Sequence, residues 1–446
     1  MDLSKLTINN NELVTLANTL LKDLFPICRS ITGDGVRETF KRLQELTEFS
    51  VLEIPSGNNC YDWEVPKEWN IKDAFIKDEE GNKIVDFKNS NLHVVNYSQP
   101  IDKKINYEEL VSHIHTLPNL PDAIPYRTTY YQDNWGFCMT HNEILKLDKG
   151  NTYEVLIDTT LSDGSLSIGE CILNGRSKKE FLISTYSCHP SLGNDNLSGI
   201  VLWTLLLHTL KQYNLYHTYR FIIHPETIGS IAYLSQYEKE LQNIDGGFVI
   251  TTVAGPDKFS YKESFDEQSD IDFAVSKTFE ELNIETIVYP FNLNGSDERQ
   301  FSSPAFRIPT CTISKNKYYE YPYYHTSLDN LDYIKGEYLV ETLNLYLSAI
   351  QKLEMNVKFE SNFKKCEPRL GKRLLYPNIG GMLNPNKSVS EDKITEDDIS
   401  IIKVLNFYGN GEYTIFDVSK ITGHSVSKLS KMVTLLIKKG ILKEIL

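Results

Sequence analysis

The sequence predicts an α/β protein of several domains, built around a sheet that is mixed but mostly parallel. Between residues 151 and 350, short apolar segments alternate with helical ones, which is typical of a buried parallel sheet. Residues 60–150 contain short segments with strand-like alternation, and residues 391–446 contain three helical segments followed by a strand. At 446 residues the chain is long enough for two or three domains, since one domain commonly takes about 100–200 residues.

The composition narrows the classes of partner. Hydrophobic residues make up 41% of the chain, as expected of a globular protein with real cores. The net charge of −14 argues against nucleic acid as the main partner, because phosphate binding needs a basic surface. No apolar stretch approaches the ~20 residues of a membrane span, so we expect no membrane partner.

The cysteines and the N-terminal residues indicate the compartment. The seven cysteines include no C-x-x-C pair, which favours free thiols in a reducing environment over a disulfide framework. The first residues, Met1-Asp2-Leu3-Ser4-Lys5, lack the basic and apolar regions of a signal peptide. We therefore expect a cytoplasmic protein.

The first 59 residues are expected to begin the larger domain, which continues from 151 to 355. Leucines at helical spacing predict a helix over 11–25, and a second helix is expected near 36–47, before a strand at 51–54. Between the helices lies a loop of turn formers that contains Arg29. Arg29 has two interpretations of equal weight: it binds a substrate carboxylate, or it ties down the glycine-containing loop.

Residues 60–150 are expected to form an inserted β-rich domain. Strand-like segments lie at 73–77, 83–87 and 92–97, and Asp78–Asn82 has the composition of a hairpin turn. Three of the four tryptophans lie here, at 63, 69 and 135. Aromatic segments at 126–131 and 134–138 are expected mainly to pack, with the alternative that they face an active cleft.

Residues 151–355 are expected to complete the larger domain. The predicted strands cover 153–157, 169–173, 181–186, 219–223 and 247–251, and the predicted helices cover 198–212, 228–241, 268–282 and 336–354.

The C-terminal quarter divides into a linker and a small domain. Residues 356–390 are rich in Pro and Gly and are expected to be a linker. Residues 391–446, three helices and a strand, predict a winged-helix domain. Its eight Lys balance eight Asp and Glu, so its net charge is zero. A docking or dimerisation module is therefore favoured over DNA binding, and a homo-oligomer through this domain is possible.

One loop supplies the first candidate metal ligands. Ser187–Gly199 follows an apolar strand, precedes an apolar helix and contains His189 and Asp195. In open α/β sheets, ligands bind at the carboxyl ends of strands beside such turns. Imidazole nitrogen and carboxylate oxygen both suit a divalent metal.

Three later segments of similar character complete a candidate site. Each is polar, rich in turn formers and next to a strand or helix end, and they contribute Glu226, Asp297 and His325. Two histidines and three carboxylates are the mix expected for two divalent ions about 3.5–4 Å apart. Taken singly, each residue also fits a structural role, since Asp beside Gly or Asn is commonly a turn former.

These segments resemble a known family. Asn194-Asp195-Asn196-Leu197-Ser198-Gly199 is similar to the N-D-N-A-S-G loop of the di-zinc aminopeptidases, whose relatives include glutamate carboxypeptidase and glutaminyl cyclase. Three later segments follow in the family's order: Glu226 with Gly229-Ser230, then Ser296-Asp297 with Phe301 and Ile308-Pro309, then His325-Thr326 with Asp329. The resemblance covers roughly 150–350 and implies a zinc-exopeptidase-like α/β/α sandwich, here in a bacterial branch with an inserted β domain and a C-terminal winged helix.

The resemblance also implies roles for the candidate residues. Asp195 would bridge two zinc ions, with His189 and Asp297 on one and Glu226 and His325 on the other. The chain departs from the family in two ways: only six residues separate His189 from Asp195, and Pro225 stands where the general base is usually a Glu. Glu226 could take the base role, or Glu298 could serve, and either one or two zinc ions could bind.

The implied function is metal-assisted hydrolysis of a peptide or small amide. Candidate groups for a substrate carboxylate are Arg29, Arg127 and Arg299; Tyr324 is a further substrate-binding candidate. Candidates for a substrate amino group are Glu263, Asp266 and Glu298. Two alternatives stay open: a binding or scaffold protein that kept the fold but lost turnover, and, less favoured, a transcription regulator that uses the winged helix.

Overall fold

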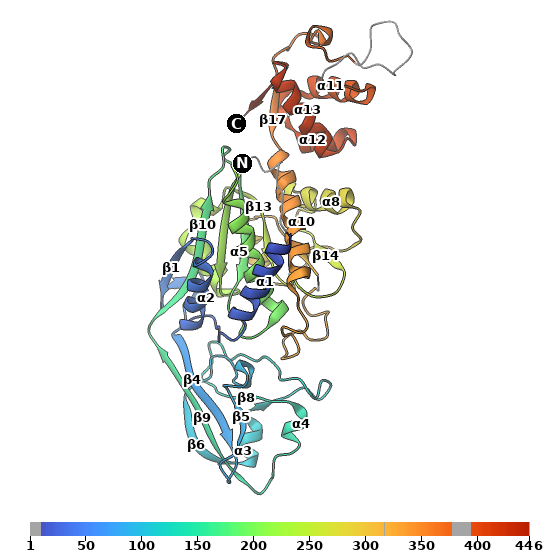
Figure 1. The fold of residues 1–446 in the computed structure, drawn as a ribbon. Coiled ribbons are helices and arrows are strands. Elements are labelled where there is room, and N and C mark those ends of the chain that lie inside the picture. The colour runs from blue at the N-terminus through green and yellow to red at the C-terminus, as the bar shows by residue number, and fades with distance from the viewer. Residues whose placement is uncertain (1–9, 316, 377–393, 446) are drawn as a thin grey trace.

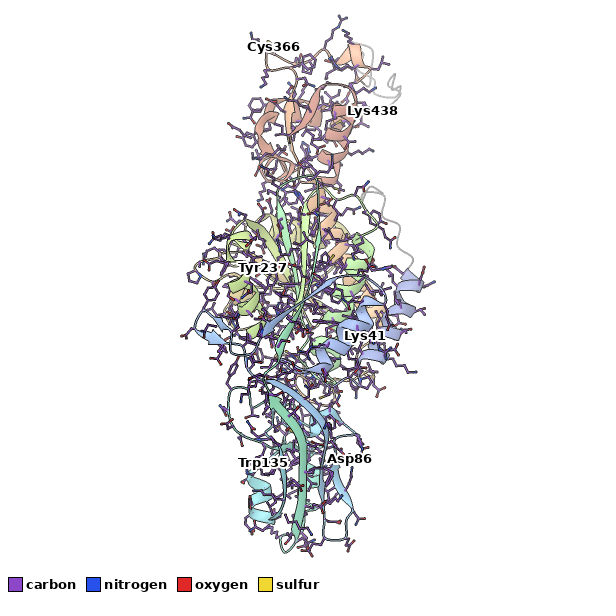
Figure 2. All side chains as sticks on the ribbon, turned by 90° about the vertical axis from the view of Figure 1, so that its left-hand side faces the viewer. Lys41, Asp86, Trp135, Tyr237, Cys366 and Lys438 are labelled. Atoms are coloured by element: carbon purple, nitrogen blue, oxygen red, sulfur yellow. The ribbon has the colours of Figure 1, made fainter. Side chains whose placement is uncertain are left out.

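The computed structural model describes residues 10–315, 317–376 and 394–445. Figure 1 shows three parts stacked along one axis, with an α/β body in the middle, a β-rich part at one end and the C-terminal domain at the other. Labelled side chains mark the same order in Figure 2: Trp135 and Asp86, then Lys41 and Tyr237, then Cys366 and Lys438. None of the seven cysteines is paired.

An eight-stranded mixed sheet forms the centre of the α/β body, in the order β1-β10-β12-β11-β13-β16-β14-β15. Strand β11 pairs in parallel with both β12 and β13, and β13 pairs in parallel with β16, so the middle of the sheet is parallel. Strands β1 and β10 are antiparallel additions at one edge. The strands are β1 (Ser50–Pro55), β10 (Ser165–Leu173), β11 (Glu180–Tyr186), β12 (Thr218–His224), β13 (Ile244–Ile250), β14 (Phe259–Lys262), β15 (Thr286–Tyr289) and β16 (Thr310–Ser314).

Helices cover both faces of this sheet, which confirms the predicted α/β/α sandwich. One apolar core joins the sheet to α1 (Asn10–Leu24), α2 (Asp34–Gln44), α5 (Ser198–Leu210), α8 (Asp270–Leu282) and α10 (Gly336–Met355). A second core, on the other face, includes residues of α6 (Ile228–Gln236), α7 (Glu238–Leu241) and α9 (Glu298–Phe301). Helix α5 is apolar all round and almost wholly buried, as expected of a helix enclosed on every side.

The inserted part is built on a four-stranded antiparallel sheet in the order β5-β4-β9-β6. Its strands are β4 (Glu68–Lys77), β5 (Lys83–Asp86), β6 (Ile101–Asn106) and β9 (Thr152–Ser162). Strands β4 and β9 are the long pair that connects it to the α/β body (Figure 1). Shorter elements complete it: β2 (Asn59–Cys60), β3 (Trp63–Glu64), α3 (Tyr107–Ser112), β7 (Ile114–His115), β8 (Phe137–Cys138) and α4 (His141–Ile144).

Two predicted strands differ from the structure here. The strand expected at 153–157 exists as part of β9, but it pairs with β4 and β6 and not with the central sheet. The segment 92–97 was predicted as a strand, yet Asn91–His93 form a 3-10 turn. The side chain of Ser90 accepts a hydrogen bond from the backbone N–H of Leu92, and this cap favours the turn over an extended strand.

The C-terminal domain has the predicted winged-helix elements and two additional strands, β17 and β18. Its helices are α11 (Glu396–Tyr408), α12 (Ile415–Thr422) and α13 (Val426–Lys438), and its sheet has the order β18-β17-β19. Strands β18 (Asn410–Thr414) and β19 (Leu442–Ile445) flank β17 (Lys358–Ser361), which lies inside the range expected to be a linker. Residues 377–390 of that expected linker lie outside the described residues.

The C-terminal domain packs on the α/β body. The ring of Phe416 in α12 lies 4.8 Å from that of Phe273 in α8, and the large apolar core continues from the sheet into this domain. Across the described ranges, no helix has the length and apolar character needed to cross a membrane.

Candidate metal centre

The site begins at the carboxyl end of β11, in the parallel centre of the sheet. The loop that follows β11 carries His189 and turns through Gly193–Leu197 into α5, which places Asp195 just before that helix. The Asp329 carboxylate accepts hydrogen bonds from the backbone N–H groups of Asn194 (2.6 Å) and Asp195 (3.0 Å). These bonds fix the loop in one conformation, with its polar side chains buried.

Three of the predicted metal ligands converge. One nitrogen each of His189 and His325 and one oxygen of Asp195 lie within 4.8 Å of one another. Nε2 of His325 lies 2.9 Å from Oδ2 of Asp195, and Nε2 of His189 lies 4.0 Å from the same oxygen. Two imidazoles and a carboxylate are a ligand set that zinc accepts.

The unsatisfied atoms of this group fit a metal ion. Oδ2 of Asp195 and Nε2 of His325 are buried, and neither makes a hydrogen bond of acceptable geometry with any described residue. Buried polar atoms are rarely left without a partner, so these two atoms, side by side at the end of the cleft, fit a site that could hold a cation. Oδ1 of Asp195 is already engaged, because Tyr186 donates its hydroxyl to it at 2.5 Å.

The ionisation of the group also suits a metal. Burial lowers the pKa of His189 to about 4, which leaves its imidazole neutral and able to coordinate at neutral pH. Burial opposes ionisation of Asp195, but His189, His325 and the Tyr186 hydroxyl together lower its pKa to about 2. The carboxylate is therefore charged across the physiological range.

Glu226 lies beside the three ligands, directly after β12. Its Oε2 is 3.9 Å from Nε2 of His189, and its Oε1 accepts a hydrogen bond from the Ser296 hydroxyl at 2.8 Å. Burial, together with the nearby carboxylates of Asp297 and Asp195, raises the pKa of Glu226 well above its ordinary value. A carboxylate with a raised pKa beside a candidate metal-binding group is suited to accept and return a proton.

Strained backbone surrounds these side chains. Thr227, which follows Glu226, has φ 64°, and His325 has φ 55°, although neither residue is a glycine. Positive φ values in such residues are uncommon and cluster at functional sites. The His325 segment is braced by the inserted part, because the backbone N–H of Tyr126 donates to the His325 carbonyl at 2.8 Å.

Asp297 and Glu298 lie near the site but are not brought into the group of three ligands. Oδ1 of Asp297 accepts hydrogen bonds from the Thr227 N–H (2.8 Å) and the Ser230 hydroxyl (2.7 Å), which hold its carboxyl at the start of α6. Glu298 is buried, and its carboxylate accepts hydrogen bonds from Thr312 (2.8 Å), Tyr318 (3.1 Å) and the Ser296 N–H (2.9 Å). Glu298 therefore holds the loop that presents Ser296 to Glu226.

The four predicted substrate-binding residues lie in four different environments. Arg29 is fully buried and donates to the carbonyls of His189 (3.0 Å) and Leu24 (2.7 Å), which matches its structural interpretation. Arg127 donates to the Tyr126 carbonyl at 2.8 Å. Tyr324 stacks on His325 at 3.9 Å, and exposed Arg299 donates to the Thr227 hydroxyl at 3.4 Å.

A cleft of about 330 Å³ opens onto the site. His189, Glu226 and His325 form its polar end, and aromatic side chains of the inserted part line much of the rest. The sequence interpretation favoured packing for the 126–131 segment, yet Tyr126, Thr128, Tyr130 and Tyr131 all face the cleft; Trp63 and Cys188 were not predicted there. No sequence signal places Trp63 in the cleft, because its position depends on how its hairpin folds.

Comparison with known proteins agrees with this architecture. Residues 18–356 match the family described as "Domain of unknown function (DUF4910)", and residues 358–444 match a winged helix-turn-helix. A protein of Clostridium acetobutylicum, "Putative polysaccharide biosynthesis protein with aminopeptidase-like domain", is 39% identical over 442 residues, which cover 99% of each chain.

Solved structures show the same fold. The crystal structure of a "putative peptidase" from Clostridium acetobutylicum is 38% identical, covers 98% of each chain and has a TM-score of 0.87. A zinc aminopeptidase from Bacillus subtilis is 14% identical, with a TM-score of 0.56 over 78% of this chain and 96% of that one. An M28 peptidase precursor from Shewanella amazonensis is 11% identical, with a TM-score of 0.51 over 77% and 96%. The chain therefore belongs to the DUF4910 family, with an aminopeptidase-like fold followed by a C-terminal winged helix.

Proposed function

We propose that this protein is a zinc-dependent hydrolase that cleaves a peptide or other amide bond. The observation that carries the proposal is the convergence of His189, Asp195 and His325 beside Glu226, at the end of a central parallel strand. The aminopeptidase-like fold and the zinc aminopeptidase among its structural neighbours support the choice of reaction and metal. His189, Asp195 and His325 would hold a single ion.

In this proposal Glu226 is the general base that the Pro225 position does not provide. Zinc, when bound, lowers the pKa of coordinated water and polarises a carbonyl oxygen. Glu226 would accept the proton of the attacking water and deliver it to the leaving amine. The Ser296 hydroxyl orients the Glu226 carboxylate, and Glu298 and Asp297 hold the two loops that meet there.

Chromogenic amides test this function. Zinc- or cobalt-loaded protein is expected to release p-nitroaniline from a panel of free and N-acylated aminoacyl p-nitroanilides, and chelation is expected to abolish the release. A protein that binds zinc stoichiometrically but cleaves no member of the panel would contradict hydrolysis and favour a binding or scaffold role.

A further inference from the structure

The cleft that opens onto the metal centre has an aromatic wall supplied by the inserted part. Trp63 of β3 and Tyr131 contact each other edge to face, with ring centroids 5.7 Å apart. The Tyr131 hydroxyl donates to the Glu64 carbonyl at 3.1 Å, which ties the second ring to the hairpin of the first. Although both side chains line the cleft, Trp63 is 42% and Tyr131 49% exposed, so these apolar faces are available to a ligand.

Among its described lining residues, the same cleft lacks a carboxylate that is free to pair with a substrate ammonium group. Among the described residues that line it, Glu226 is the one carboxylate, and the proposed chemistry already uses Glu226 as the base. Glu263 and Asp266 do not line the cleft, and Glu298 is buried among Thr312, Tyr318 and the Ser296 backbone. None of the three carboxylates expected to hold an amino group is therefore positioned to do so.

A positive charge lies at the rim instead. The Arg299 guanidinium donates to the hydroxyl of Thr227, which lines the cleft directly after Glu226. A cation at this position repels a substrate ammonium and attracts carbonyl oxygens. An ammonium group that loses part of its water shell on binding is best held by a dedicated anion, because desolvation of the charge is costly.

We propose that the cleft selects amides whose acyl part carries an apolar or aromatic side chain on Trp63 and Tyr131 and an acylated, uncharged nitrogen in place of a free amino terminus. The proposal rests on the hydrolase function for the identity of the scissile bond. The preference for an uncharged ligand rests only on the walls of the cleft, so binding tests it separately from turnover.

A pair of ligands that differ only at the nitrogen gives the direct test. Isothermal titration calorimetry at pH 6.5, where an α-amino group is protonated, would compare N-acetyl-phenylalaninamide with phenylalaninamide. We expect the acetylated ligand to bind at least 10-fold more tightly. The same contrast in kcat/KM is expected for N-acetyl-phenylalanine p-nitroanilide against phenylalanine p-nitroanilide.

Variants of the aromatic wall test the second half of the proposal. Trp63→Ala and Tyr131→Ala are each expected to weaken N-acetyl-phenylalaninamide at least 5-fold and to leave N-acetyl-glycinamide unchanged. Phe407→Ala, which removes an exposed aromatic ring of the C-terminal domain, is the matched control and should change neither.

The outcomes separate this inference from the proposed function. Selective binding of the acetylated ligand without turnover would support the inference and refute the hydrolase proposal. Equal or tighter binding of the free amine would overturn the inference even if both p-nitroanilides are cleaved. Unchanged binding in both wall variants would overturn the role of the aromatic wall.

Discussion

Replacing Glu226 by Gln distinguishes the role of a general base from that of a metal ligand. Glutamine has the shape of glutamate and can still accept the hydrogen bond that the Ser296 hydroxyl donates at 2.8 Å. It cannot accept a proton from water at neutral pH. Because Glu226 lies outside the group formed by His189, Asp195 and His325, the variant should keep that group intact.

The expected loss of activity in Glu226→Gln follows from the role of Glu226 as general base. General-base catalysis contributes roughly 10²- to 10⁴-fold, or about 3–5 kcal/mol of activation free energy. We expect Glu226→Gln to lower kcat by this factor while KM and zinc affinity change less than about threefold. In the wild type, activity should fall as the pH drops through the raised pKa of Glu226, so the acid limb should lie above pH 4.5.

Steady-state kinetics and zinc content of the purified variant give the assay. Retention of more than a third of the wild-type kcat would refute the assignment of Glu226 as the base. Loss of zinc together with activity would instead make Glu226 a metal ligand. Glu108→Gln is a matched control, since Glu108 is an exposed glutamate of α3 outside the cleft lining.

Three further changes test neighbouring parts of the structure. Ser296→Ala removes a hydrogen bond that lowers the pKa of Glu226, so the acid limb of the pH–rate profile should move to higher pH; an unchanged profile would contradict this contact. Arg37 donates to both oxygens of Glu68 (2.9 and 2.6 Å) where β4 leaves the α/β body, which lowers the pKa of Glu68 to about 2. The contribution of this ion pair to the free energy of unfolding is present above pH 4.5 and is lost as the pH falls from 4.5 toward 2. Glu68→Gln should therefore lower the free energy of unfolding by roughly 1–2 kcal/mol at pH 7 after solvent screening. Denaturant unfolding at pH 7 and pH 3 checks both statements, and equal stability of wild type and variant at pH 7 would contradict them. Phe416→Ala, at the contact with α8, should lower the free energy of unfolding by about 3–5 kcal/mol, and a loss below 1 kcal/mol would show that the C-terminal domain is not docked through this ring.

Much of the fold could be predicted from periodicity. The apolar stripes of α1 and α10 and the continuous apolar runs of β11 and β12 have the spacing of buried helices and strands, and the structure places them within a few residues of the predicted ranges. Partner choice could not be predicted in this way. The alternation in β9 shows that one face is buried but not against which sheet, so the strand was expected in the central sheet and lies in the inserted one.

The site was predictable as a set of side chains but not as a geometry. The positions of His189 and Asp195 after a predicted buried strand favoured a site there, because ligands bind at the carboxyl ends of parallel strands. His325 comes from the long loop between β16 and α10, and only the fold brings it to the same point. The hydrogen bonds that Thr227 and Ser230 donate to Oδ1 of Asp297 carry no sequence signal, and Asp297 is not among the three grouped side chains. Trp63 was missed because its place in the cleft depends on how the inserted part folds back over the α/β body.

Zinc binding tests the central claim most directly. Isothermal titration with zinc, checked by elemental analysis, would compare the wild type with His189→Ala, Asp195→Ala and His325→Ala, and with His141→Ala as a control from α4, outside the cleft lining. We expect one zinc per chain in the wild type and in the control, and a loss of affinity on the order of 100-fold or more in each of the three variants. No zinc in the wild type, or wild-type affinity retained in an Asp195→Ala, His325→Ala double variant, would contradict the account.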